Sequence, residues 1–219
     1  MKATNRLISN LAYVAALAFA VSTTSAQVQN PGFELAGATP NLATNWNILA
    51  ASGGAFALAT RTNFNPHSGS FDLYMEGIGN PGAPNIDVRS DFIPVTFGTS
   101  YKFSFWAANT LKVGGANPQW DIFWYDASNL PVGAPTFVSF SSVGSTYTLV
   151  TNAITITPPS ALAVKATVGW IQAVGAGAGD HWITQIDDVS FAAVPEPTTL
   201  SLVGLGLASA FIMSRRRKS

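Results

Sequence analysis

Tyr101-Lys102-Phe103-Ser104-Phe105-Trp106 is the stretch that decides the fold. Side chains alternate between the two faces of a β-strand, so Tyr101, Phe103 and Phe105 share one face. Trp106 shares the opposite face with a lysine and a serine. This pattern predicts a strand whose three aromatic residues pack into a hydrophobic core.

The same alternation recurs along the chain between clusters of Gly, Pro, Asn and Ser. About ten short strands at this spacing indicate an all-β fold, either a barrel or an antiparallel β-sandwich, and we expect a sandwich of the jelly-roll type. Helices are expected only at the chain ends, because no other part has a sustained 3.6-residue apolar period. The predicted strands are Trp46–Leu49, Phe56–Arg61, Phe71–Glu76, Ile86–Val95, Tyr101–Ala108, Trp120–Asp126, Thr136–Ser141, Thr146–Thr157, Val164–Val174 and Trp182–Ala192.

One predicted strand, Trp120–Asp126, carries aromatic residues on both faces. Trp120 and Trp124 lie on one face, whereas Phe123 and Tyr125 lie on the other. Aromatic residues on both faces are typical of a central strand whose outer face is covered or used for binding.

The N-terminus has the pattern of a secretory signal helix. Lys2 and Arg6 precede the apolar run Leu11–Val21, which is too short for a comfortable membrane anchor. Small residues follow, so we expect signal peptidase to cleave between Ala26 and Gln27. The alternative is an uncleaved N-terminal anchor.

The C-terminus combines a short rigid motif, an apolar run and a basic end. The run Leu200–Met213 lies in an uncharged stretch at the short limit for a transmembrane helix. The cations after it are expected to stay cytoplasmic, which places the body across the membrane. The alternative is a plain C-terminal anchor. The motif is Val194, Pro195, Glu196 and Pro197, and the basic end is Arg215, Arg216, Arg217 and Lys218.

This combination resembles the PEP-CTERM sorting signal of Gram-negative bacteria. The resemblance implies that an exosortase in the inner membrane processes the tail. It further implies a transient inner-membrane anchor and a mature protein at the cell surface or in the extracellular matrix. The family is linked to exopolysaccharide and biofilm production, which makes an exopolysaccharide an expected partner.

Between these ends, at residues 27–193, we expect one domain, with a signal peptide at 1–26 and a sorting tail at 194–219. The whole chain is formally neutral, but six of its eleven cations lie in the two ends. The body, Gln27–Val194, keeps five cations and ten acids, a net charge of −5. An acidic body with scattered cations argues against binding to nucleic acid. The chain has no cysteine, which leaves the redox compartment open.

Four motifs of the body occur in an order similar to that of galactose-binding-like jelly rolls, which serve as carbohydrate-binding modules and envelope domains. The resemblance spans most of the body and implies the same fold. The motifs are Asn30-Pro31-Gly32-Phe33-Glu34, His67-Ser68-Gly69-Ser70-Phe71, Tyr101-Lys102-Phe103-Ser104-Phe105-Trp106 and Ile186-Asp187-Asp188-Val189-Ser190-Phe191.

The second resemblance implies a structural calcium site where the first and last strands meet. Ca²⁺ prefers carboxylate and carbonyl oxygens, so Glu34, Asp187 and Asp188 are the candidate ligands. In the alternative, Glu34 caps backbone amides. The two aspartates then end in solvent or pair with Arg61 or Arg89.

Exposed aromatic side chains are the candidates for glycan binding, because sugar rings stack on aromatic faces. Most tryptophans of a small sandwich belong to its core, so a core position is the alternative for each one. Trp106 is the best candidate, because the opposite face of its strand is aromatic. Trp120, Trp124 and Tyr125 follow.

The sequence offers little for catalysis, and we expect no enzyme. The turn His67-Ser68-Gly69-Ser70 lacks the Gly-x-Ser-x-Gly pattern of a nucleophile elbow. The alternative is a secreted carbohydrate-active enzyme of the glycoside hydrolase type, which needs two facing carboxyl groups. The acid pairs Asp72/Glu76 and Asp121/Asp126 are candidates for that role only because any two acids could meet, and we expect them in solvated strand positions or salt bridges.

Overall fold

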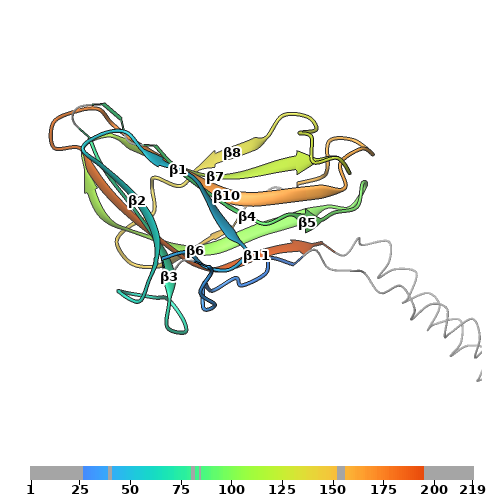
Figure 1. Ribbon diagram of the computed structural model, residues 1–219, viewed down its shortest axis with the longest axis horizontal. Helices are drawn as coiled ribbons and strands as arrows, with labels where there is room; N and C mark the ends of the chain where they lie inside the picture. The colour runs from blue at the N-terminus through green and yellow to red at the C-terminus, as the bar shows by residue number, and fades with distance from the viewer. Residues whose placement is uncertain (1–26, 39–40, 80–81, 84, 152–155, 195–219) are drawn as a thin grey trace, which may run out of the picture. The chain divides into compact units, whose positions relative to one another are not determined.

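The body folds as two antiparallel β-sheets packed face to face (Figure 1). The computed structural model describes residues 27–38, 41–79, 82–83, 85–151 and 156–194, which belong to one compact unit, Ala26–Val194. In these ranges no helix is present, and thus none that is long and apolar enough to span a membrane. The helices expected near the two chain ends lie outside the described residues. The predicted all-β sandwich is confirmed.

The first sheet has six strands in the order β1-β4-β10-β7-β8, with β5 paired to β10. All of its pairs are antiparallel, and β10 lies at its centre. Its strands are β1 (Trp46–Ser52), β4 (Asn85–Ser90), β5 (Ile93–Pro94), β7 (Ala116–Tyr125), β8 (Thr136–Ser139) and β10 (Lys165–Val174).

The second sheet has five strands in the order β2-β3-β11-β6-β9. The N-terminal segment lies against the last strand of the chain, because the Val189 N–H donates to the Pro31 carbonyl at 3.0 Å. The first and last parts of the body therefore meet, as expected. The strands of this sheet are β2 (Phe56–Thr62), β3 (Asp72–Ile78), β6 (Tyr101–Val113), β9 (Thr148–Thr151) and β11 (His181–Ala193).

Aromatic side chains fill the space between the sheets. Tyr101, Phe103 and Phe105 of β6 are buried, so the face predicted from the alternation is confirmed. From the other sheet, Trp46 stacks on Trp170 with ring centroids 5.1 Å apart. Burying each large aromatic side chain removes roughly 150–250 Å² from water, which makes this cluster a main source of stability.

Two predicted strands differ from the structure. The stretch Ile86–Val95 is broken at Asp91, whose carboxylate accepts hydrogen bonds from the side chains of Asn45 and Asn47. This local pairing interrupts the ladder, and the chain continues as β5. The predicted strand Thr146–Thr157 is regular only at β9, and its residues 152–155 lie outside the described part.

Candidate functional site

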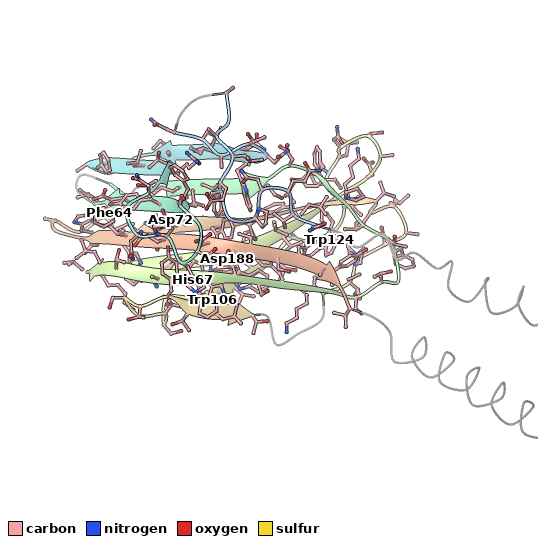
Figure 2. The ribbon with its side chains drawn as sticks, turned by 90° about the horizontal axis from the view of Figure 1, so that it is seen from below. Phe64, His67, Asp72, Trp106, Trp124 and Asp188 are labelled. Carbon is pink, nitrogen blue, oxygen red and sulfur yellow. The ribbon has the colours of Figure 1, made fainter. Side chains whose placement is uncertain are left out.

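A cluster of polar side chains, here called the His67 cluster, lies on the outer face of the five-stranded sheet. It consists of Glu34, His67, Ser68, Asp187 and Asp188, brought together from the N-terminal segment, the turn before β3, and β11 (Figure 2). A β-bulge between Asp187 and Ser190 interrupts the pairing of β11 with β6, and Asp188 takes a positive φ of 49°. This irregularity allows two consecutive carboxylates to reach the same turn.

Asp187 is fully buried and bound by backbone amides. Its carboxylate accepts the N–H of Ser68 at 2.9 Å and the N–H of Asp188 at 2.7 Å. Burial raises the pKa of the Asp187 carboxyl to about 6, although these two hydrogen bonds lower it.

Asp188 holds the turn through side chains. One carboxylate oxygen lies 2.7 Å from Nδ1 of His67, and the other accepts the Ser68 hydroxyl at 2.6 Å. The imidazole of His67 also stacks on Trp106, with ring centroids 4.0 Å apart. One face of the Trp106 ring is therefore covered, and the predicted sugar platform at this residue is largely occupied by the protein's own histidine.

Glu34 caps backbone amides, as in the alternative raised from the sequence. Its Oε1 accepts the N–H groups of Ser70 at 2.8 Å and Phe71 at 3.1 Å. Gly69 has a positive φ of 58°, and a Cβ there would overlap the Glu34 carboxylate. A glycine is therefore required at this position.

The two aspartates do not pair with arginine. Arg61 donates instead to the carbonyls of Phe33 at 2.6 Å and Glu34 at 2.7 Å, and Arg89 lies on the other sheet. Of the alternatives to a calcium site, pairing of the two aspartates with Arg61 or Arg89 is therefore wrong.

The cluster has the composition of a cation site. A Cβ on Gly32 would lie 3.5 Å from Asp187 Oδ1, 3.8 Å from Asp188 Oδ1 and 3.8 Å from Glu34 Cγ. The glycine thus leaves open space between three acidic side chains. Ligand atoms of His67, Asp187 and Asp188 also lie within 4.8 Å of one another. This oxygen-rich set fits a hard divalent cation.

A second polar region lies on the outer face of the six-stranded sheet, here called the Arg89 face. One row of the register runs from Arg89 of β4 through Gly169 of β10 and Asp121 of β7 to Phe137 of β8. A Cβ on Gly169 would come within 2.8 Å of Arg89 Cγ. The glycine therefore lets the arginine side chain cross β10 towards β7.

The guanidinium of Arg89 lies between two carboxylates and on an aromatic ring. It is 2.7 Å from Asp87 and 3.6 Å from Asp121. Its carbon lies 3.7 Å from the centroid of Phe123, which contacts Phe137 edge to face at 5.7 Å. Asp87, Arg89 and Asp121 together carry a net charge of −1 when both acids are ionised.

Several polar atoms of the Arg89 face are buried without a hydrogen-bond partner among the described residues. They are both carboxylate oxygens of Asp121, Oδ1 of Asp87, Nε of Arg89 and Oγ1 of Thr167. Burial raises the pKa of Asp121 to about 7, against the attraction of Arg89. Arg89 Nε and Asp121 Oδ1 still attract each other at 3.6 Å, and the other unpartnered buried atoms among the described residues are Asp72 Oδ1, Trp170 Nε1, Gln172 Oε1 and Gln185 Oε1. Buried groups of this kind are costly, which makes the charged cluster at Arg89 a candidate functional site.

The structure corrects the predicted glycan-binding residues. Trp120 and Trp124 are each 3% exposed and belong to the core, so neither offers a face to a ligand. Tyr125 lies half-buried at the edge of the Arg89 face. Arg89 and Phe137 were not among the glycan-binding candidates predicted from the sequence. Only the pairing of β4, β10, β7 and β8 brings these two residues onto one face.

The acids proposed for hydrolysis have separate partners. Asp72 accepts hydrogen bonds from Tyr147 at 2.9 Å and Gln185 at 2.8 Å. Glu76 lies 2.6 Å from Nε2 of His181. Asp126 accepts the amides of its own loop. The structure thus gives the predicted pairs Asp72/Glu76 and Asp121/Asp126 different surroundings rather than a shared cleft.

The sorting motif begins where the sandwich ends. The N–H of Val194 donates to the Ser100 carbonyl at 2.7 Å, directly after β11. Pro195, Glu196, Pro197, the basic end and Ala26 lie outside the described residues, and Gln27 is the first described one.

Residues 193–218 match the family model of the PEP-CTERM protein-sorting motif. The predicted resemblance of the tail is therefore confirmed. The motif indicates a secreted protein that is anchored in the membrane by its C-terminus before an exosortase processes it. No curated protein sequence matches the chain.

Solved structures with a similar fold include parts of two enzymes. The enzymatically active domain of tailspike protein 4 of bacteriophage CBA120 is 18% identical, with a TM-score of 0.56 over 76% of this chain and 21% of that chain. An arabinose-bound α-L-arabinofuranosidase, MgGH51, is 14% identical, with a TM-score of 0.50 over 77% of this chain and 26% of that chain. This chain therefore spans about a quarter or less of their length.

The family 22 carbohydrate-binding module at the C-terminus of Clostridium thermocellum Xyn10B is also similar. It is 15% identical, with a TM-score of 0.45 over 78% of this chain and 96% of the module. Carbohydrate-binding modules with a β-sandwich fold are thus among the structural neighbours. The likeness of this chain to the tailspike domain and the arabinofuranosidase, at 18% and 14% identity, concerns the fold alone.

Proposed function

We propose that the chain is an exported envelope or matrix protein whose β-sandwich body binds a glycan without catalysing a reaction. Signal peptidase releases the N-terminus between Ala26 and Gln27, and the C-terminal helix anchors the precursor in the inner membrane. An exosortase then processes the tail at Val194–Pro197, and the mature body reaches the cell surface or the matrix. Its partner there is an exopolysaccharide of the biofilm.

The observation that carries the proposal is the Arg89 face. The paired side chains of Asp87 and Arg89 lie beside two aromatic rings, Phe123, which Arg89 covers on one face, and Phe137, which is 44% exposed. Glycan sites combine these two elements, because sugar C–H groups pack on aromatic rings and hydroxyls pair with charged groups. Asp121 is fully buried, so a bound sugar would contact the partly exposed side chains of Asp87 and Arg89, whose exposed fractions are 15% and 13%.

The charges of the face favour a neutral glycan. Asp87 and Asp121 outnumber Arg89, and the body as a whole has a net charge of −5. A polyanionic polysaccharide would be repelled, whereas neutral hydroxyls are good donors to carboxylates. We therefore expect neutral polysaccharides to bind more tightly than uronate-rich or sulfated ones.

Two other roles are open to test. A purely structural matrix protein would have the same fold and sorting tail but no glycan affinity. A hydrolase of the glycoside type would need two carboxyl groups on either side of the scissile bond. Asp87 and Asp121 instead share Arg89 between them, which supports binding rather than hydrolysis.

We further propose that the His67 cluster holds a structural Ca²⁺. Asp187 and Asp188 each present a carboxylate oxygen beside Gly32, which is the ligand type that Ca²⁺ prefers. Glu34 lies next to them through its Cγ and would have to turn its free carboxylate oxygen towards the ion. When bound, the ion supplies positive charge that offsets these acids and ties the N-terminal segment to β11.

The glycan proposal is tested by measuring the affinity of the body, Gln27–Val194, for a panel of neutral and acidic polysaccharides. Phe137→Ala is expected to weaken binding, because an aromatic contact contributes about 0.5–1.5 kcal/mol, or about twofold to tenfold in affinity. Phe56→Ala is the matched control, since Phe56 is 40% exposed and Phe137 44%, but Phe56 lies on the other sheet. Binding to no glycan, or equal losses in both variants, would refute the proposal.

A further inference from the structure

The strand β11 finishes at the end of the sandwich where β5 lies (Figure 1). Several exposed apolar side chains lie in the loops of this end, here called the apolar end. They come from four segments, which are the two loops that flank β5, the loop after β7 and the loop before β10. Each is between 39% and 70% exposed, which is unusual for large apolar residues grouped together. The members are Phe92, Phe97, Leu130, Leu162 and Val164.

Hydrogen bonds tie these loops to one another. The N–H of Val95 donates to the carbonyl of Val164 at 3.0 Å, and the N–H of Val164 donates to the carbonyl of Tyr125 at 2.9 Å. Lys165 donates from Nζ to the carbonyl of Ala127 at 3.1 Å. The apolar side chains are therefore presented by a connected surface rather than by independent loops.

The chain leaves the sandwich at this same end. Val194 is bound to Ser100, and five residues separate it from the apolar run Leu200–Met213. A fully extended segment of that length spans at most about 20 Å. The 13-residue strand β6 is about 40 Å long, so this end of the body stays near the membrane while the tail is anchored.

The charges at the apolar end are balanced, because Asp91 precedes Phe92 and Asp126 lies in the loop that carries Leu130. The body is acidic overall, yet two of its five cations, Lys102 and Lys165, lie at this end. Lys102 is exposed, and Nζ of Lys165 lies 5.4 Å from the ring centroid of Phe92. Cations beside apolar side chains favour the interface of a membrane that contains anionic lipid.

We propose that the apolar end docks on the lipid surface that holds the tail. Phe97, Leu130 and Leu162 enter the boundary between headgroups and acyl chains, and the two lysines contact the headgroups. The proposal rests on the C-terminal membrane anchoring in the proposed function but not on glycan binding. In the precursor, docking of this end keeps the strands at a steep angle to the membrane, so the Arg89 face does not point at the lipid.

The test uses the full chain in vesicles of phosphatidylethanolamine and phosphatidylglycerol. The chain has no cysteine, so single variants Phe97→Cys and Leu162→Cys take one environment-sensitive fluorophore each. Val113→Cys is the matched control, since Val113 is 46% exposed but lies at the opposite end of β6. Quenching by lipids labelled in the acyl chain is expected to be several-fold stronger at 97 and 162 than at 113.

A second variant separates docking from anchoring. Phe97→Ser with Leu162→Ser is expected to keep the melting temperature, because both side chains are exposed, and to reduce quenching of a probe at Leu130→Cys. Resistance of the vesicle-bound chain to carbonate extraction reports anchoring itself. If the chain resists extraction but the probes at positions 97, 162 and 113 are quenched equally, the tail is anchored and the apolar end does not dock. That result overturns the docking proposal alone. Chains that are extracted overturn both the anchoring and the docking that rests on it.

Discussion

The imidazole of His67 lies nearly parallel to the indole of Trp106, with ring centroids 4.0 Å apart and planes inclined by 15°. The two residues come from the turn before β3 and from β6, and Asp188 holds the histidine in place at 2.7 Å. The contact links the turn to the face of the five-stranded sheet. It also explains why the most exposed tryptophan of the body is not a free sugar platform.

Removing this imidazole should uncover Trp106. The other five tryptophans are at most 6% exposed, so quenching of tryptophan fluorescence by acrylamide reports mainly on Trp106. His67→Ala is expected to increase quenching, whereas His181→Ala, which breaks a contact to Glu76, is not. Unchanged quenching in His67→Ala would show that the stacked geometry is not kept in solution.

The turn before β3 depends on Gly69. Gly69→Ala is expected to reduce the free energy of unfolding by about 2–4 kcal/mol, because Ala is strained at φ 58° and its Cβ would also displace the Glu34 carboxylate that caps two amides. Gly98→Ala is the matched control, with φ 81° and nothing within 4 Å of the added Cβ. Gly98→Ala should lower the free energy of unfolding only through the strain of a positive φ, which is about 1–2 kcal/mol. Chemical denaturation that ranks the two variants equally would argue against the Glu34 cap.

Stability should fall as pH rises through the titration of Asp121. Burial raises its pKa from 3.8 to about 7, so between these values the folded state binds more protons than the unfolded state. The contribution of protonated Asp121 to the free energy of unfolding is complete below pH about 4. It is lost as the pH rises towards 7. Asp121→Asn, which cannot ionise, should flatten this part of the profile of melting temperature against pH. A profile identical to that of the unaltered protein would contradict the burial of an ionisable group there.

Removal of calcium should destabilise the body. At a calcium concentration about 100 times the dissociation constant, binding contributes about 2.7 kcal/mol, or roughly 5–10 °C in melting temperature for a domain of this size. Adding a chelator is expected to lower the melting temperature by that amount in the unaltered protein. Asp187→Asn should largely remove the response. A transition temperature unchanged by the chelator would exclude a structural metal.

Local alternation was sufficient to predict much of the fold. The aromatic face of β6 and the approximate positions of most strands follow from a two-residue period in the sequence. Both faces of β7 carry aromatic residues, so alternation in the sequence did not identify its inner face. The packing against β6 decided it, since Trp120 contacts Phe103 edge to face at 5.4 Å.

The sites depend on contacts between distant segments, which the period does not encode. Asp188 lies 121 residues from His67, and Arg89 reaches Asp121 only because Gly169 lies between them in the sheet. The motifs did predict that Glu34 and the Asp pair belong to one region. Their partners are backbone amides, a histidine and a serine rather than the arginines considered from the sequence.

The most direct test of the glycan-binding account is a map of amide chemical shifts during titration of the body with a neutral oligosaccharide from the panel. If the body binds glycan as proposed, the amide chemical shifts should change most on the Arg89 face, at Arg89, Gly169 and Phe137. The shift of Val113 on the other sheet should change little. Changes concentrated on β6 around Trp106, or no change with any glycan, would contradict it.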